Sequence, residues 1–187
     1  MSRRTEFSTW YLSPSPTVTR AAIAGAAGAL PYVAMKIYWS WGGAAGKPAG
    51  MNIADEFARN GAPQFLVWLE RHGIDFTAVG TILGIALLGA LTRPWGQVVP
   101  RWVPGLRGRR VPRWLLLAPG WASALALMPY GGLGLMVIVT GGLTTVNTAG
   151  MSPVVFVIGF LNFFSIGLSL GVCSLSYQRR TKPLPAY

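Results

Sequence analysis

The sequence predicts an all-α polytopic membrane protein, a bundle of four transmembrane helices with a short amphipathic helical loop on its outer side. The chain has 187 residues, 52% of them apolar, and a mean hydropathy of +0.45. Much of this apolar content lies in four long runs, and a helix needs about 20 such residues to cross a hydrocarbon core. The expected helices are about 18–41, 74–92, 114–139 and 153–177.

Positive charge is concentrated in alternate segments around these runs. Twelve of the 16 lysines and arginines lie before the first run or at its start, between the second and third runs, and after the fourth: Arg3, Arg4, Arg20, Arg93, Arg101, Arg107, Arg109, Arg110, Arg113, Arg179, Arg180 and Lys182. Glu6 is the only acid in these segments. Since cytoplasmic loops are rich in Lys and Arg, we expect both tails, 1–17 and 178–187, in the cytoplasm and the bundle, 18–177, in the membrane.

The net charge of +11 would point to nucleic acid in a soluble protein. Membrane topology already accounts for where this charge sits, so we expect no nucleic-acid partner. The expected partner is the lipid bilayer, whose anionic headgroups attract basic segments such as the second loop.

The first expected helix carries small residues and an internal cation. Ala21, Gly25 and Gly28 share one face, and small residues at this spacing let another helix approach closely in lipid. Apart from Arg20 at the start of the first span, Lys36 is the only cation inside an expected span. It either extends its ammonium group to the interface or pairs with an outer carboxylate, with Asp75 as the first choice, because intramembrane charges usually have partners.

The connection after the first helix is expected to contain two short helices. Asn52 followed by Asp55 is a helix start signal, and Gly61 is a stop signal. Pro63 and Gly73 suit the start and end of a second piece. Its apolar face follows the spacing i, i+3, i+4, i+7, with Phe65, Trp68, Leu69 and His72. Such an amphipathic helix should lie on the outer surface or cap the bundle.

Helices two and three contain further packing and breaking signals. Gly80 and Gly84 form a G-x-x-x-G packing face. In helix three, Pro129 is followed by Tyr130 and two glycines, and we expect the helix to kink or open there. A break at membrane depth is tolerated only where it is buried in protein or lines a cavity.

Helix four carries a polar stripe along one face. The spacings of 3, 4, 4 and 3 join Asn162, Ser165, Ser169, Cys173 and Ser176. These groups either hydrogen-bond to neighbouring helices as packing contacts or line a polar cavity, with Asn162 near mid-membrane beside the expected break in helix three.

Acid–base groups on the outer side are few. They are Asp55, Glu56, Glu70, His72 and Asp75. A carboxylic acid that faces an apolar cavity has a raised pKa and can donate a proton. Asp75 is the first candidate because its neighbours, Ile74 and Phe76, are apolar. The ordinary alternative for all these acids is solvation or pairing at helix ends.

Substrate contacts are expected from aromatic residues and one amide. Trp39, Trp68 and Tyr130 would shield a cationic intermediate, and Asn162 would line the cavity. No metal or other cofactor is expected, because the chain has one His, one Cys, no H-E-x-x-H and no C-x-x-C. No Walker loop and no G-x-G-x-x-G is present either.

Three short stretches resemble a group of small actinobacterial four-helix membrane proteins. The stretches are Thr92-Arg93-Pro94-Trp95-Gly96, Val111-Pro112-Arg113-Trp114-Leu115 and Ala118-Pro119-Gly120-Trp121. The resemblance covers about a quarter of the chain and implies the fold and a bacterial inner membrane, with no catalytic residues to transfer. A fainter analogy, without a motif at named positions, is to small membrane-bound terpene cyclases.

Three functional hypotheses follow. The first is an intramembrane enzyme that acts on a lipophilic, isoprenoid or lipid-like substrate by acid-triggered chemistry. The second is a non-catalytic accessory subunit, small-molecule carrier or immunity protein, which the abundant small-residue packing faces suit. A channel or transporter is least favoured, because four helices offer little room in a monomer, although a homo- or hetero-oligomer through Gly80 and Gly84 would change that.

Overall fold

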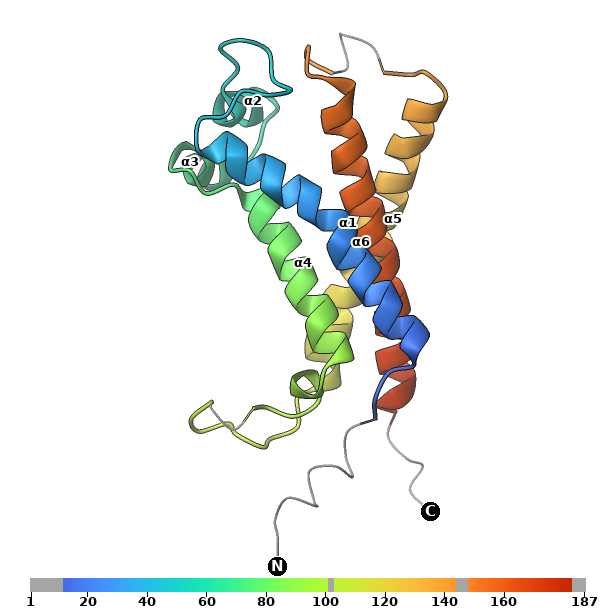
Figure 1. Cartoon of the computed structure of the whole chain (residues 1–187). Helices are drawn as coiled ribbons and strands as arrows, with labels where there is room; N and C mark the ends of the chain where they lie inside the picture. The colour runs from blue at the N-terminus through green and yellow to red at the C-terminus, as the bar shows by residue number, and fades with distance from the viewer. Residues whose placement is uncertain (1–11, 101–102, 144–147, 183–187) are drawn as a thin grey trace, which may run out of the picture.

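The computed structural model describes residues 12–100, 103–143 and 148–182, and this part of the chain is helical throughout its regular structure (Figure 1). One isolated antiparallel bridge joins Val98 and Arg110. The α-helices are α1 (Pro16–Ser40), α2 (Ile53–Arg59), α3 (Gln64–Arg71), α4 (Phe76–Thr92), α5 (Arg113–Val139) and α6 (Pro153–Arg180), with a 3₁₀ turn η1 (Pro94–Gly96) after α4.

Three of these helices, α1, α5 and α6, are long and apolar enough to cross a membrane. The helix α4 has 17 residues and reaches that standard only together with α3, from which it is bent by 94°. By length and composition the described chain therefore has three spans, or four if α3 and α4 count as one bent span. The expected helix 74–92 is shortened at its start, because Asp75 caps α4 from outside.

The tightest packing is between α5 and α6. A Cβ on Gly131 would collide with the backbone of α6, and a Cβ on Gly167 would collide with the backbone of α5. On the other side of α6, the small face expected on α1 is confirmed, since Gly25 lies against Ser169 and Gly28 against Ser165. By contrast, α4 packs on α1 and α6 and hardly touches α5.

Helix three does not open at Pro129, so this alternative of the expected break is wrong, while a kink there stays a prediction. α5 is helical from Arg113 to Val139 through both Pro119 and Pro129. A proline removes one backbone donor and displaces one carbonyl, but here the turns after Pro129 are pressed against α6. Gly131 meets the backbone at Phe164 and Gly134 meets the ring of Phe160, so close packing maintains the helix.

The first and last helices extend slightly beyond their expected bounds. α1 begins at Pro16, with Ser15 as its cap, and residues 1–11 and 183–187 of the expected tails lie outside the described residues. α6 continues past 177 to Arg180, because this arginine is bound at the end of the helix. Its guanidinium donates to the carbonyls of Leu12 (2.6 Å) and Leu91 (2.8 Å).

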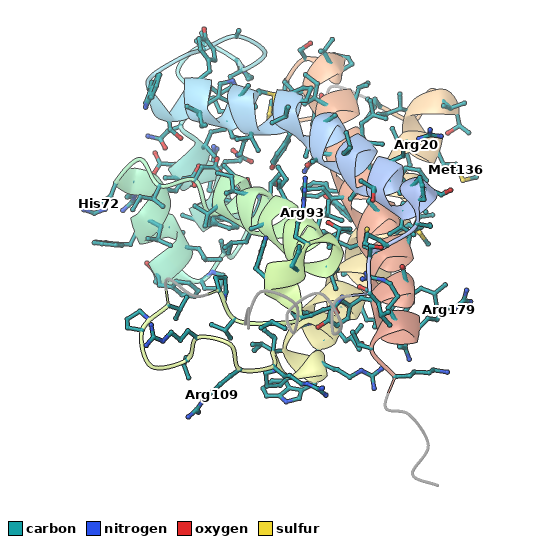
Figure 2. All side chains as sticks on the ribbon, turned by 60° about the horizontal axis from the view of Figure 1, so that its bottom comes forward. Arg20, His72, Arg93, Arg109, Met136 and Arg179 are labelled. Carbon is teal, nitrogen blue, oxygen red and sulfur yellow. The ribbon has the colours of Figure 1, made fainter. Side chains whose placement is uncertain are left out.

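The Arg-rich segments gather at one end of the molecule. In Figure 1 the start of α1, the end of α6 and the end of α4 lie toward the bottom, while α2 and α3 lie at the top. Figure 2 brings the lower end forward and shows Arg93, Arg109 and Arg179 spread over it. All four acids in the described residues lie at the opposite end, in α2, in α3 and at the start of α4: Asp55, Glu56, Glu70 and Asp75.

Candidate functional site

A buried ion pair joins α1 to the start of α4. The ammonium Nζ of Lys36 lies 2.6 Å from Oδ2 of Asp75, and the two residues are only 5% and 6% exposed. Lys36 also lies over the rings of Trp39 (5.4 Å) and Phe57 (5.7 Å). Of the two alternatives that the sequence left for Lys36, pairing with Asp75 is the one that the structure adopts.

The second oxygen of Asp75 organises the first turn of α4. Its Oδ1 accepts from the backbone N–H groups of Thr77 (2.9 Å) and Ala78 (2.8 Å), which makes Asp75 the N-cap. The hydroxyl of Thr77 also donates to Oδ1 (2.6 Å) and accepts from the hydroxyl of Tyr32 (2.8 Å). Three donors and one ammonium group thus stabilise the ionised form of this carboxyl.

Glu70 at the end of α3 is the remaining member of this cluster. Its Oε2 is buried and no donor faces it in the described structure. Burial and then the neighbouring Asp75 carboxylate raise the pKa of Glu70 to about 7, although the Lys36 ammonium acts in the opposite direction. A proton on Glu70 provides a donor for the hydrogen bond to Asp75. Near neutral pH, Glu70 is therefore the group of this cluster that gains and loses a proton.

An aromatic cavity of about 380 Å³, here called the outer pocket, adjoins the cluster between α1, α2, α5 and α6. Lys36 and Tyr32 form part of its wall, so the hydrogen-bond chain from Asp75 through Thr77 ends at a residue of that wall. Its other rings include Trp39, Phe57, Tyr130, Phe156, Phe160 and Phe163. The Tyr130 and Phe163 rings meet edge to face at 5.4 Å, which suits an apolar, partly unsaturated guest.

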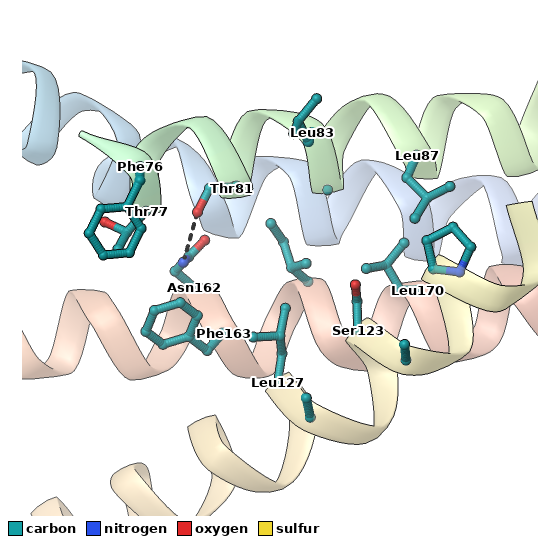
Figure 3. Close-up of a pocket in the computed structure, with 16 residues that line it drawn as sticks. Phe76, Thr77, Thr81, Leu83, Leu87, Ser123, Leu127, Asn162, Phe163 and Leu170 are labelled. Atoms are coloured by element: carbon teal, nitrogen blue, oxygen red, sulfur yellow. Dashed lines mark hydrogen bonds between the residues drawn. The ribbon is translucent and has the colours of Figure 1, made fainter. Parts of the chain in front are cut away.

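A second cavity of about 570 Å³, here called the α4–α5 groove, lies between α4 and α5 and is floored by α6 (Figure 3). Its lining is mostly aliphatic, with Asn162 of α6 and Thr81 of α4 at its polar point. The Asn162 amide donates to the Thr81 hydroxyl at 3.4 Å. The structure thus places Asn162 in a different cavity from Trp39 and Tyr130, with which the sequence had grouped it.

Two other residues of the polar stripe on α6 make packing contacts, as the first interpretation expected. The hydroxyl of Ser169 donates to the carbonyl of Ala21 at 2.8 Å, and the thiol of Cys173 lies 3.9 Å from the carbonyl of Val18. Both contacts join α6 to α1. Asn162 lines the α4–α5 groove, but this groove is mostly aliphatic and is not the polar cavity that the alternative expected.

The remaining predicted site residues lie apart from the cluster. Asp55 pairs with Arg71 on the exposed surface at 3.1 Å. Glu56 lines the outer pocket but is held by Arg59. Trp68 is 57% exposed and stacks on His72, outside both cavities. Within the described chain, no group of three or more His, Cys, Asp or Glu could hold a metal ion.

Sequence reasoning missed Tyr32 and Thr77, which connect Asp75 to the outer pocket. A signal for both exists. Tyr32 precedes Lys36 by one helical turn and so shares its face. Thr77 stands two residues after an Asp at a helix start, where a capping side chain binds the backbone.

Comparison of this chain with protein-family models, curated proteins and solved structures finds no match in any of the three.

The buried pair predicts a strongly non-additive double-variant cycle. Lys36→Met leaves a buried carboxylate unpaired, and Asp75→Asn keeps a capping oxygen but leaves a buried ammonium group. Each single variant should lose about 3–5 kcal/mol of unfolding free energy. The double variant should lose clearly less than their sum, as measured by reversible unfolding in mixed micelles. Arg59→Gln, which breaks an exposed pair, should cost under about 1 kcal/mol; equal effects of Arg59→Gln and Lys36→Met would contradict the assignment.

The raised pKa of Glu70 predicts a specific loss of stability with pH. Because the folded protein holds this proton more tightly than the unfolded chain, its contribution is full below the ordinary pKa of a glutamate and is lost as the pH rises to about 7. Glu70→Gln should remove this decline when unfolding is compared between about pH 5 and about pH 8. Asp55→Asn should retain the decline in stability with pH. An unchanged pH profile in Glu70→Gln would show that Glu70 titrates normally.

Proposed function

We propose that the chain is an integral membrane protein of a bacterial inner membrane, with four spans and both termini in the cytoplasm. The separation of arginines and acids to opposite ends supports this orientation. The 17 residues of α4 rise about 26 Å, enough to cross a thin hydrocarbon core. In this arrangement the bend of 94° lays α3 along the outer surface, where its exposed Phe65 and Trp68 suit the interface.

This topology predicts which positions a membrane-impermeant thiol reagent reaches. In a Cys173→Ala background, Asn60→Cys should be labelled from outside intact cells, and Leu106→Cys only after the inner face is opened. Both positions are exposed. Labelling of Leu106→Cys in sealed, intact cells would reject the proposed orientation.

We infer that the outer pocket binds a lipophilic molecule, with an isoprenoid-like chain as the best fit. The pocket opens beside the apolar body of the bundle and is walled by rings whose faces attract positive charge. Its one buried cation, Lys36, is neutralised by Asp75. The pocket can therefore hold an apolar guest, or an intermediate with positive charge, next to balanced polar groups.

Acid-triggered chemistry on this guest is the proposed reaction, and the observation that carries it is the proton on Glu70. Glu70 lies beside Asp75, the Thr77 hydroxyl donates to Asp75, and the Tyr32 hydroxyl donates to Thr77. Delivery of a proton to the pocket therefore requires both hydroxyls to turn round. Glu70 then gives its proton to Asp75, and Asp75 and Thr77 each pass one on, so that the proton that Tyr32 gives to the substrate is replaced and Glu70 is left as a carboxylate. A double bond of the guest accepts that proton, and the carbocation formed is held by the surrounding rings.

A non-catalytic carrier, accessory subunit or immunity protein is the second candidate. One observation favours it: no carboxyl that lines the outer pocket is free. Glu56 is paired with Arg59, and both oxygens of Asp75 serve the ion pair and the helix cap. In this alternative the cluster is structural, and the pocket holds its guest unchanged.

Deuterium transfer to linear polyprenes separates the two candidates. The protein in lipid nanodiscs, in deuterated buffer, should yield products with one added deuterium from solvent. Glu70→Gln and Tyr32→Phe should each reduce the rate by about 10²-fold or more, since a positioned acid is worth that much. Asp55→Asn should keep the wild-type rate of deuterium transfer. Full transfer by Glu70→Gln would exclude the proposed acid, and polyprenes recovered bound but unlabelled would establish the carrier instead.

A further inference from the structure

The α4–α5 groove is separate from the outer pocket and has a different character. Phe163 is the one residue that lines both cavities. No charged side chain lines the groove, which runs from Phe76 to Leu87, about 16 Å along α4. Its volume of about 570 Å³ lies in the range of sites for small molecules.

The groove stays open because several residues that face it from α4 and α5 are small. Gly80 of α4 faces open space, and a Cβ there would meet no atom within 4 Å. Across the groove, α5 presents Ala122 and Ala126. Leu83 is 63% exposed on the rim, so the groove opens sideways, toward lipid in the proposed topology. An elongated apolar molecule can therefore enter from the bilayer.

One buried polar atom in this groove has no partner. Asn162 is 1% exposed, and its amide nitrogen is bound to Thr81, but its carbonyl Oδ1 has no donor in the described structure. An unsatisfied buried acceptor is costly, and no bulk water is available at this depth in a bilayer. Asn162 is nine residues into α6, about 14 Å from the start of that helix.

We propose that the α4–α5 groove binds a lipophilic alcohol, whose hydroxyl donates to Oδ1 of Asn162 and whose chain lies along α4. The aliphatic lining accommodates the chain, with Leu87, Ile166 and Leu170 beyond the amide. The acyl tails of ordinary phospholipids have no donor and leave Oδ1 unsatisfied. A fatty acid would bring a negative charge into a groove without a cation. A single hydroxyl on a long chain meets both requirements.

The test uses hexadecanol and its methyl ether, which differ by the one donor hydrogen. The full-length protein in phosphatidylcholine nanodiscs is exposed to each, and bound ligand is read by native mass spectrometry and by the shift in thermal unfolding. The wild type should retain the alcohol about tenfold better than the ether, which corresponds to one net hydrogen bond of about 1.4 kcal/mol. Asn162→Leu should bind both equally.

Ser174→Ala is the matched control. Ser174 is also fully buried on α6 with an unpartnered hydroxyl, but it lies outside the groove. This variant should keep the tenfold preference. If Asn162→Leu does not fold, Leu83→Trp, at an exposed rim position, should block both ligands by filling the groove.

Three results would overturn the proposal. They are equal retention of alcohol and ether by the wild type, a preference that survives in Asn162→Leu, and a dimer that holds no alcohol, which would show a second copy in the groove. Because the two cavities differ, Phe156→Ala, at a residue that lines only the outer pocket, should leave alcohol retention unchanged. If the groove does not bind the alcohol, the proposal for the outer pocket is therefore unaffected. If the outer pocket does not bind a lipophilic molecule, the proposal for the groove is likewise unaffected.

Discussion

The buried ion pair between Lys36 and Asp75 determines how the outer half of the molecule is arranged. A lysine in a span is expensive unless it has a partner, and its partner here is also the residue that caps α4. One carboxylate thus sets where α4 begins and where α1 meets it. The same contacts bring Glu70 beside Asp75, since α3 ends only a few residues earlier. The unusual proton affinity of Glu70 is a consequence of this arrangement.

Close packing of glycines determines the other half. Gly131 and Gly167 let α5 and α6 approach until backbone meets backbone, and Gly25 and Gly28 let serine side chains of α6 pack directly on α1. In lipid, where no hydrophobic effect drives helices together, such close contact is the main source of association. α6 therefore becomes the central helix of the bundle. α4 joins it through Leu88 and Leu91 in the apolar core and through polar contacts near its ends.

Much of this fold could be predicted from the sequence, because long apolar runs, cap residues and charge placement are local signals. Asn52, Gly61 and Gly73 marked α2 and α3 closely. Local signals could not decide between the two alternatives for Lys36, because that choice depends on how two distant helices meet. They also failed at Pro129, where packing against α6 preserves a helix that the proline alone would weaken. The division of Trp39 and Asn162 between two cavities depends likewise on helix packing.

The groove exists because α4 is held against α1 and α6 and makes few contacts with α5. At the outer end Asp75 is bound to Lys36; at the inner end Arg180 donates to Leu91, and the Tyr177 hydroxyl donates to Gly96 at 2.8 Å. Between these points Thr81 is also bound to Asn162 of α6, while the groove separates the side chains of α4 from those of α5. Closing the gap would require these polar attachments to shift. The lipophilic guest proposed for the groove gains dispersion contact with both walls without such a shift.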